Sequence, residues 1–110
     1  MNSLEVLSKK IFSTEKMQKV NLFETDNMFC DLYCVLPGQT QTPHRHRGAD
    51  KIYYVLEGSG TFQIGVEEKV LGQGMIVLAS SDVDHGVKNT GRERLCLLVF
   101  MAPNPNKTTR

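Results

Sequence analysis

Short apolar runs recur along the chain from about residue 17 onward, and clusters of turn-forming residues separate them. The runs are rich in Val, Ile, Leu, Phe and Tyr, and no window keeps the period of an amphipathic helix. We therefore expect an all-β protein. The predicted strands cover residues 19–23, 28–36, 40–45, 51–57, 61–64, 68–71, 75–78, 85–88 and 94–101.

The segments between the runs carry Gly, Asn, Asp, Ser and Pro. Examples are Gly58-Ser59-Gly60 and Gly72-Gln73-Gly74, whose glycines tolerate the positive φ angles of tight turns. Short, regularly spaced strands with Gly-rich turns predict a sandwich, a barrel or a jelly roll, because these architectures cover or close their sheet edges. Periodicity alone does not choose among the three.

Two runs, residues 52–56 and 95–101, are apolar at successive positions instead of alternating. Both faces of such strands are expected to be buried. The outer face needs a cover, either the N-terminal segment or a second subunit. Because a chain of this size buries only a small core, we favour a second subunit and expect a homodimer. Residues 3–11 fit either a short helix or an added strand.

The length of 110 residues predicts one domain spanning 1–110, with a core at about 17–102 and a loosely held polar tail at 103–110. Thirteen Lys and Arg against twelve Asp and Glu give a net charge of +1 without a basic stripe, which argues against a nucleic-acid partner. No stretch approaches the roughly 20 apolar residues of a membrane span, and the N-terminus does not resemble a signal peptide. We therefore expect a cytoplasmic protein without membrane partners.

Cys30, Cys34 and Cys96 lie in apolar runs without a CxxC spacing and are expected to be reduced core thiols.

The chain holds three histidines, and their placement is informative. His44 and His46 are two residues apart, so on an extended strand both rings project from one face. His85 begins a predicted strand about forty residues later, where a barrel would bring it across the interior. Three neutral imidazoles suit a transition metal and leave positions for water or substrate. Taken alone, an HxH pair is explained about as well by exposed histidines on a strand.

From about residue 28 to residue 100 the sequence resembles the cupin superfamily. The spacing of Gly38, His44, His46 and Gly58 is similar to the first cupin motif, and the phrase Tyr54-Val55-Leu56-Glu57-Gly58 is typical of it. The second motif is matched through Gly74, His85 and Asn89. The resemblance implies a single-domain jelly-roll β-barrel, a double-stranded β-helix. It also implies one divalent metal ion, Fe, Zn, Ni or Mn, held by His44, His46 and His85.

One position departs from the family pattern. Lys51 stands where the family usually has a ligating Glu, and a protonated lysine does not bind a metal. Asp50 would reach the site only through a bulge in the strand. An inward Lys51 either lies beside a three-histidine ion, where it would pair with an anion, or replaces the charge of the metal altogether; we favour the metal. The third alternative is that Lys51 points outward.

The resemblance implies a metal-binding protein that takes a small-molecule ligand or substrate. The first functional hypothesis is a mononuclear metalloenzyme, most similar to a dioxygenase, that acts on a small organic substrate. The alternative is a non-catalytic module that binds a small ligand or a metal for sensing or regulation. Lys51 and Tyr54 are the candidate catalytic residues. The other polar residues expected near the mouth of the barrel are Gln41, Gln63, Tyr53 and Asn89.

Overall fold

The apolar runs form strands at the nine expected positions in the computed structural model, which describes residues 1–107. No strand end differs from its expected position by more than two residues. Residues 3–11, which fit either a short helix or an added strand in sequence, contain a short 3₁₀ helix, η1 (Val6–Lys9). The strands are β1 (Gln18–Glu24), β2 (Phe29–Val35), β3 (Thr40–His44), β4 (Asp50–Glu57), β5 (Ser59–Ile64), β6 (Glu67–Gly72), β7 (Ile76–Ala79), β8 (His85–Lys88) and β9 (Leu95–Ala102).

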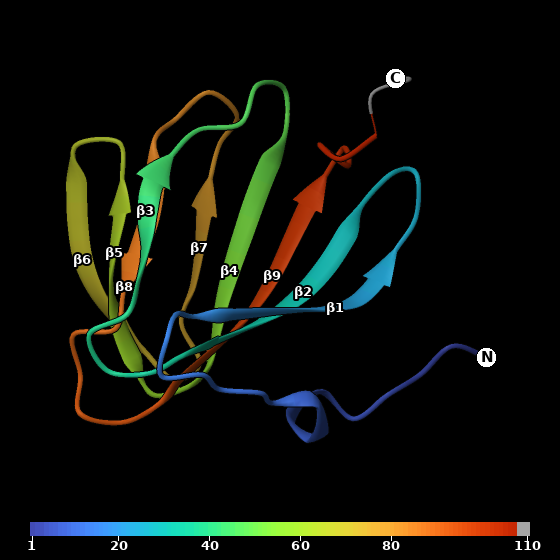
Figure 1. Cartoon of the computed structure of the whole chain (residues 1–110). Helices are drawn as coiled ribbons and strands as arrows, with labels where there is room; N and C mark the ends of the chain where they lie inside the picture. The colour runs from blue at the N-terminus through green and yellow to red at the C-terminus, as the bar shows by residue number, and fades with distance from the viewer. Residues whose placement is uncertain (108–110) are drawn as a thin grey trace.

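The strands form two antiparallel sheets that face each other (Figure 1). One sheet has the order β1-β2-β9-β4-β7, and the other has the order β3-β8-β5-β6. Neighbours such as β2 and β9 are far apart in sequence, as the crossing connections of a jelly roll require. Because the two sheets share no strand among the described residues, the predicted barrel is an open one. The structure confirms the jelly-roll fold.

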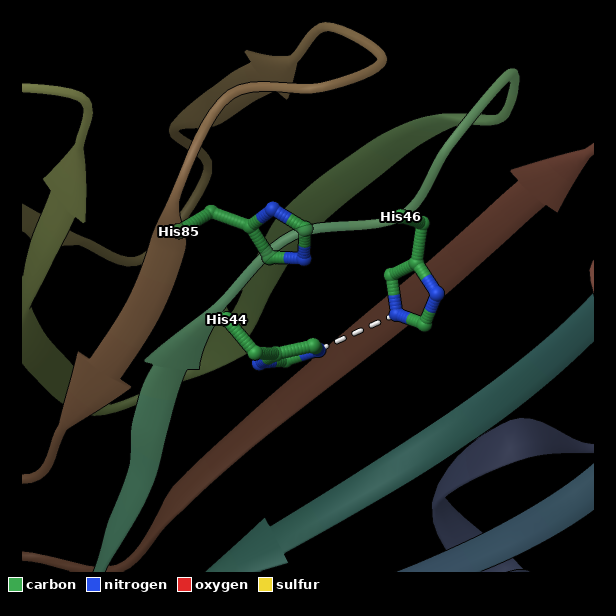
Figure 2. Close-up of side chains that lie close together, drawn as sticks. All are labelled: His44, His46 and His85. Carbon is green, nitrogen blue, oxygen red and sulfur yellow. Dashed lines mark hydrogen bonds between the residues drawn. The ribbon is translucent and has the colours of Figure 1, made fainter.

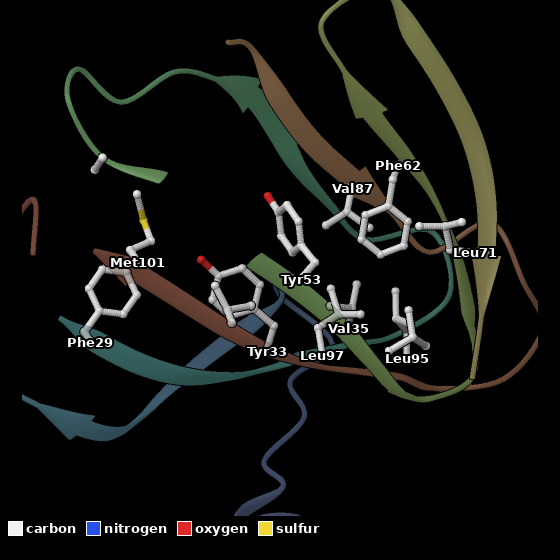
Figure 3. Packing of buried hydrophobic residues seen from close by; sticks show 13 residues of the cluster. Phe29, Tyr33, Val35, Tyr53, Phe62, Leu71, Val87, Leu95, Leu97 and Met101 are labelled. Carbon is white, nitrogen blue, oxygen red and sulfur yellow. The ribbon is translucent and has the colours of Figure 1, made fainter. Parts of the chain in front are cut away.

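The main core fills the space between the two sheets (Figure 3). Burial alternates along β4, where Tyr53 and Val55 are buried and Tyr54 between them is less so. Figure 3 shows Tyr33 and Tyr53 among aliphatic side chains, with their hydroxyl groups on the same side of the cluster. The core therefore includes two polar hydroxyls.

A second apolar cluster lies on the outer face of the larger sheet. Its buried members are Leu32, Cys34 and Cys96, and the N-terminal residues Val6 and Phe12 pack against them. The N-terminal segment therefore covers the β2 and β9 part of this face. The three cysteines are buried and free, as the sequence predicts.

The tail that was expected to be loose begins with ordered contacts. Asn104 is fully buried, and its amide donates hydrogen bonds of 2.9 Å to Glu24 Oε2 and to the Thr25 carbonyl. Residues 108–110 of that tail lie outside the described part of the chain. Asn104 thus holds the start of this segment against the β1–β2 turn. Among residues 1–107, no helix has the length and hydropathy to cross a membrane.

Candidate metal centre

The three histidines converge at one end of the space between the sheets (Figure 2). His44 is the last residue of β3, and its pairing partner across the sheet is His85, the first residue of β8. His46 follows in the loop after β3 and turns its ring back toward His44. One nitrogen from each of the three rings lies within 4.8 Å of the others. The three imidazole rings, two of them remote from the third in sequence, therefore lie close together, as we expect from the sequence.

Two of the rings are oriented by backbone carbonyls. The Nδ1 atom of His44 lies 3.0 Å from the Thr42 carbonyl, and Nδ1 of His85 lies 3.0 Å from the Val83 carbonyl. Because a carbonyl oxygen only accepts, each Nδ1 carries the hydrogen and donates it. In the neutral form of each ring, the Nε2 atom then presents a bare lone pair to the centre of the cluster. This is the arrangement that fixes imidazole ligands around a metal ion.

The Nε2 atom of His85 is buried and has no hydrogen-bond partner among the described residues. A buried acceptor without a partner is costly and uncommon in folded proteins. The Nε2 atoms of His44 and His46 are 3.1 Å apart. Two nitrogens bound to one ion at about 2.1 Å lie about 3.0 to 3.4 Å apart, so this pair already has a suitable spacing. The residues present therefore fit a metal ion.

Burial favours the neutral form of two of the rings, His85 and His46. Desolvation, together with the positive charge of Lys51, lowers the pKa of His85 to about 4. The pKa of His46 is also lowered, mainly by burial and then by repulsion from His44. Neutral imidazole is the form that binds metals. Burial therefore favours the metal-binding form of these two rings.

A glycine allows β3 and β8 to approach closely beside the two paired histidines. A Cβ atom built on Gly86 would lie 2.6 Å from the Gln41 carbonyl oxygen and 2.9 Å from the Pro43 nitrogen, both in the backbone of β3. Such distances are too short for a real side chain. Any larger residue at position 86 would push the strands apart next to His44 and His85.

Lys51 points inward, which excludes the alternative that it points outward and leaves the two inward ones. Its side chain is 1% exposed, and its Nζ atom donates hydrogen bonds to the Tyr33 hydroxyl at 3.1 Å and to Gln41 Oε1 at 3.4 Å. Nζ also lies 4.8 Å from the centre of the Tyr53 ring. Burial lowers the pKa of Lys51 to about 7. Asp50 instead is exposed and accepts a hydrogen bond from the Ser81 backbone nitrogen, so the bulge that would bring it inward is absent from β4 at this position.

Tyr54, the other candidate catalytic residue, lies on the wrong face of its strand. Successive side chains of β4 alternate, and Lys51 and Tyr53 take the inner face. Tyr54 therefore points to the outer face of the sheet, away from the histidines. Because this strand is apolar on both sides, its sequence pattern gave no sign of which face was inner.

A cavity of about 350 Å³ adjoins the histidine cluster. His44 and His46 line it together with the buried Lys51. Two further polar side chains that the sequence analysis did not single out, Tyr33 and Lys19, lie on its wall. Its remaining lining residues are Phe29, Asp31, Met101, Pro105 and Asn106.

The other polar residues expected at the mouth divide into two groups. Gln41 is buried and joins Tyr33, Tyr53 and Lys51 through hydrogen bonds. Asn89 is buried but structural, because its amide donates to the Val35 and Glu93 carbonyls at 2.9 Å each. Gln63 lines a different hollow, beside β5 and β8. Only Gln41 and Tyr53 of this group approach the histidine site.

Comparison with known proteins places this geometry in a family. A cupin-domain family model matches residues 31–101. The crystal structure of TT1209 from Thermus thermophilus superposes with a TM-score of 0.93 at 40% sequence identity, covering 96% of this chain and 100% of that one. An RmlC-like cupin from Desulfovibrio desulfuricans has the same fold, with a TM-score of 0.84 at 24% identity and coverage of 94% and 98%.

A curated relative is also similar in sequence. It is named oxalate-binding protein, from Thermotoga maritima, and is 32% identical over 65 residues. The match covers 59% of this chain and 54% of that protein, so it spans about half of the relative's length. The family model alone matches well over half of the present chain. The chain therefore belongs to the cupin family.

Proposed function

We propose that this cupin binds one divalent transition metal ion through the Nε2 atoms of His44, His46 and His85, and a small organic molecule beside that ion. The observation that carries the proposal is the buried Nε2 of His85, which lacks a partner among the described residues and faces the other two rings. Three neutral imidazoles suit Fe, Zn, Ni or Mn and leave coordination positions open for a further ligand.

The proposed activity is that of a mononuclear metalloenzyme similar to a dioxygenase. A bound Fe(II) ion would supply a Lewis-acidic, redox-active centre with open positions. The chain's own residues would hold the ion, fix the imidazole tautomers through the Thr42 and Val83 carbonyls, and enclose the organic substrate in the adjoining cavity. Among the residues that line the cavity, Lys51 is the candidate for direct contact with the substrate.

A non-catalytic binding role is the second candidate. The relative from Thermotoga maritima is named for binding oxalate and not for a reaction. In this role the same three histidines and the same cavity would capture a small ligand together with the metal. The two candidates share the site and differ only in whether the bound molecule is transformed.

The metal site is tested by the metal content of protein purified without chelators. We predict close to one ion per chain in the wild type and a loss of most of it in His85→Ala. Gln63→Ala, beside a different hollow on β5, serves as the matched control and should keep the wild-type stoichiometry. Unchanged metal content in His85→Ala would falsify the ligand assignment. Oxygen uptake by Fe(II)-loaded protein with a panel of chelating organic acids then separates the two candidate functions, since a binding module consumes none.

We also propose that the protein is a homodimer. Six apolar side chains on the outer face of the larger sheet form two cross-strand rows, Leu78-Ile52-Phe100 and Ile76-Tyr54-Leu98. Ile76 and Leu78 are more than half exposed, and no charged residue interrupts the rows. A second copy of the same patch would cover them about a two-fold axis without like-charge repulsion.

We further propose that the protein works in the cytoplasm. The three free, buried thiols support this proposal, because cytoplasmic proteins keep their cysteines reduced.

A further inference from the structure

Four buried polar side chains form a connected hydrogen-bond network beside the histidines. The Lys51 ammonium donates to the Tyr33 hydroxyl and to Gln41 Oε1. Tyr53 donates its hydroxyl hydrogen to the same Gln41 Oε1 at 2.6 Å, and Gln41 Nε2 donates to the Tyr33 hydroxyl at 3.2 Å. Because a cation and a hydroxyl both face Oε1, the orientation of the Gln41 amide is fixed. The network is therefore rigid and specifically arranged.

Counting donors and acceptors in this network leaves three hydrogens without acceptors in the described part of the chain, one each on Gln41 Nε2, the Tyr33 hydroxyl and Lys51 Nζ. The Tyr33 oxygen accepts from both Lys51 and Gln41, which occupies its two lone pairs, so its own hydrogen must point elsewhere. The Lys51 ammonium has three N–H groups and two acceptors. Within residues 1–107, no hydrogen bond uses the Tyr33 hydrogen or the third Lys51 hydrogen. Both side chains are at most 2% exposed.

These two donors lie on the wall of the cavity that His44 and His46 also line. When Lys51 is protonated the cavity carries an excess of positive charge, because Lys19 and Lys51 then bring two positive charges and Asp31 brings one negative charge. The Asp31 carboxylate accepts a hydrogen bond from Asn21 at 2.9 Å, and no ion pair joins it to either lysine in the described part of the chain. A ligand that offers anionic oxygens would satisfy both donors on the cavity wall and balance the charge.

We propose that the cavity binds a small organic acid by its carboxylate, with Lys51 Nζ and the Tyr33 hydroxyl donating hydrogen bonds to the carboxylate oxygens. The inference rests on the proposed function for the role of the metal, and it adds the class of ligand. The rest of the acid extends toward the histidine cluster, where its other oxygen atoms are available to the ion. Lysine in place of the usual glutamate thus removes a metal ligand and supplies an anion receptor.

The experiment measures binding of pyruvate by calorimetry to metal-loaded protein, with pyruvamide as the uncharged analogue. Lys51→Met and Tyr33→Phe each remove one donor. Lys88→Met and Tyr54→Phe are matched controls, because Lys88 is exposed on β8 and Tyr54 lies on the outer face of β4. Metal content is measured for every variant first. Since Tyr33→Phe removes only an oxygen atom, it keeps the test valid should Lys51→Met fold poorly.

We expect pyruvate affinity to fall at least about tenfold in Lys51→Met and about fivefold in Tyr33→Phe, with unchanged metal content, because each loses a charge-assisted or buried hydrogen bond. Pyruvamide binding and both controls should change less than about twofold. Wild-type affinity for pyruvate in both donor variants would overturn the inference, as would equal wild-type affinity for pyruvate and pyruvamide.

The outcome separates this inference from the metal proposal. If the wild type takes up no metal, the proposed function fails, and the receptor is tested on metal-free protein with acetate and acetamide. Acetate binding that is lost in Lys51→Met would support the anion receptor even then. Failure of the metal-free wild type to prefer acetate over acetamide would overturn it.

Discussion

At the scale of single residues, Lys51 is the most unusual feature of this cupin. Its ammonium group is buried and donates hydrogen bonds to two neutral acceptors, the Tyr33 hydroxyl and Gln41 Oε1. No carboxylate forms an ion pair with it among the described residues. Burying a charge without an opposite charge destabilises a fold. The buried charge of Lys51 therefore lowers the folding stability of the ligand-free protein, and a bound anion would restore part of that stability.

This loss of stability predicts that Lys51→Met stabilises the metal-free, ligand-free protein. We expect the free energy of unfolding at pH 7 to rise by about 2 kcal/mol, measured by urea denaturation, because a buried cation is replaced by an apolar chain of similar length. Gln41 and Tyr33 keep each other as partners, so no new unsatisfied group arises. Lys88→Met, at an exposed position, should change stability little.

The same substitution has a defined pH dependence. The pKa of Lys51 is about 7 in the folded protein and close to its ordinary value in the unfolded chain. Between these values the unfolded chain binds more protons than the folded one, so wild-type stability rises with pH over this window. The advantage of Lys51→Met should thus be full below about pH 7 and shrink toward pH 10. An advantage that is independent of pH, or a variant less stable than the wild type throughout, would contradict a buried lysine at this site.

At the scale of secondary-structure elements, the site depends on how closely β8 packs against β3. Gly86 lies where a Cβ would meet the backbone of Gln41 and Pro43. Because His44 and His85 are paired across these two strands, a displacement of either strand separates two of the three rings. The glycine therefore keeps His44 and His85 close together as well as allowing the sheet to form.

Gly86→Ala should lower the free energy of unfolding by about 1 to 3 kcal/mol, as overpacking does elsewhere, and should reduce metal content below half of the wild-type level. Gly72→Ala is the matched control, since the nearest atoms to a Cβ at that position are 4.0 Å away. Thermal unfolding and metal analysis of both variants check this. A Gly86→Ala protein with normal metal content would show that the close approach of β3 and β8 is not needed for the site.

The elements also show what the sequence allows one to predict and what it does not. Turn glycines and short apolar runs were sufficient for the nine strands, because these features act locally. The convergence of the three histidines was expected from the resemblance to the cupin motifs, but His85 reaches His44 from the neighbouring strand of the same sheet and not from across the interior. The direction of Lys51 could not be predicted, because β4 is apolar on both faces and gives no alternation to follow. Tyr33 was overlooked for the same reason, since β2 is buried at six of its seven positions.

At the scale of the whole molecule, the N-terminal segment covers only part of the outer sheet face. Val6 and Phe12 pack over the β2 and β9 side, while Ile76 and Leu78 on β7 remain exposed. Isolated exposed apolar residues are common, but a continuous patch across three strands usually marks an interaction site. The two cross-strand rows on β7, β4 and β9 form such a patch.

A charge placed in this patch should separate the proposed dimer. We predict that the wild type sediments with twice the mass of one chain at micromolar concentration and that Leu78→Lys sediments as a monomer. Val70→Lys is the control, because Val70 is similarly exposed but lies on β6 of the other sheet. A monomeric wild type would contradict the homodimer, and a dimeric Leu78→Lys would exclude this face as its interface.

The central claim is that His44, His46 and His85 together hold one metal ion. The most direct measurement is diffraction from crystals of the metal-loaded protein at the absorption edge of the metal. The account predicts a single strong anomalous peak at about 2.0 to 2.3 Å from the Nε2 atoms of all three rings. A peak bound to fewer than three of these rings, or no peak between the sheets, would contradict it.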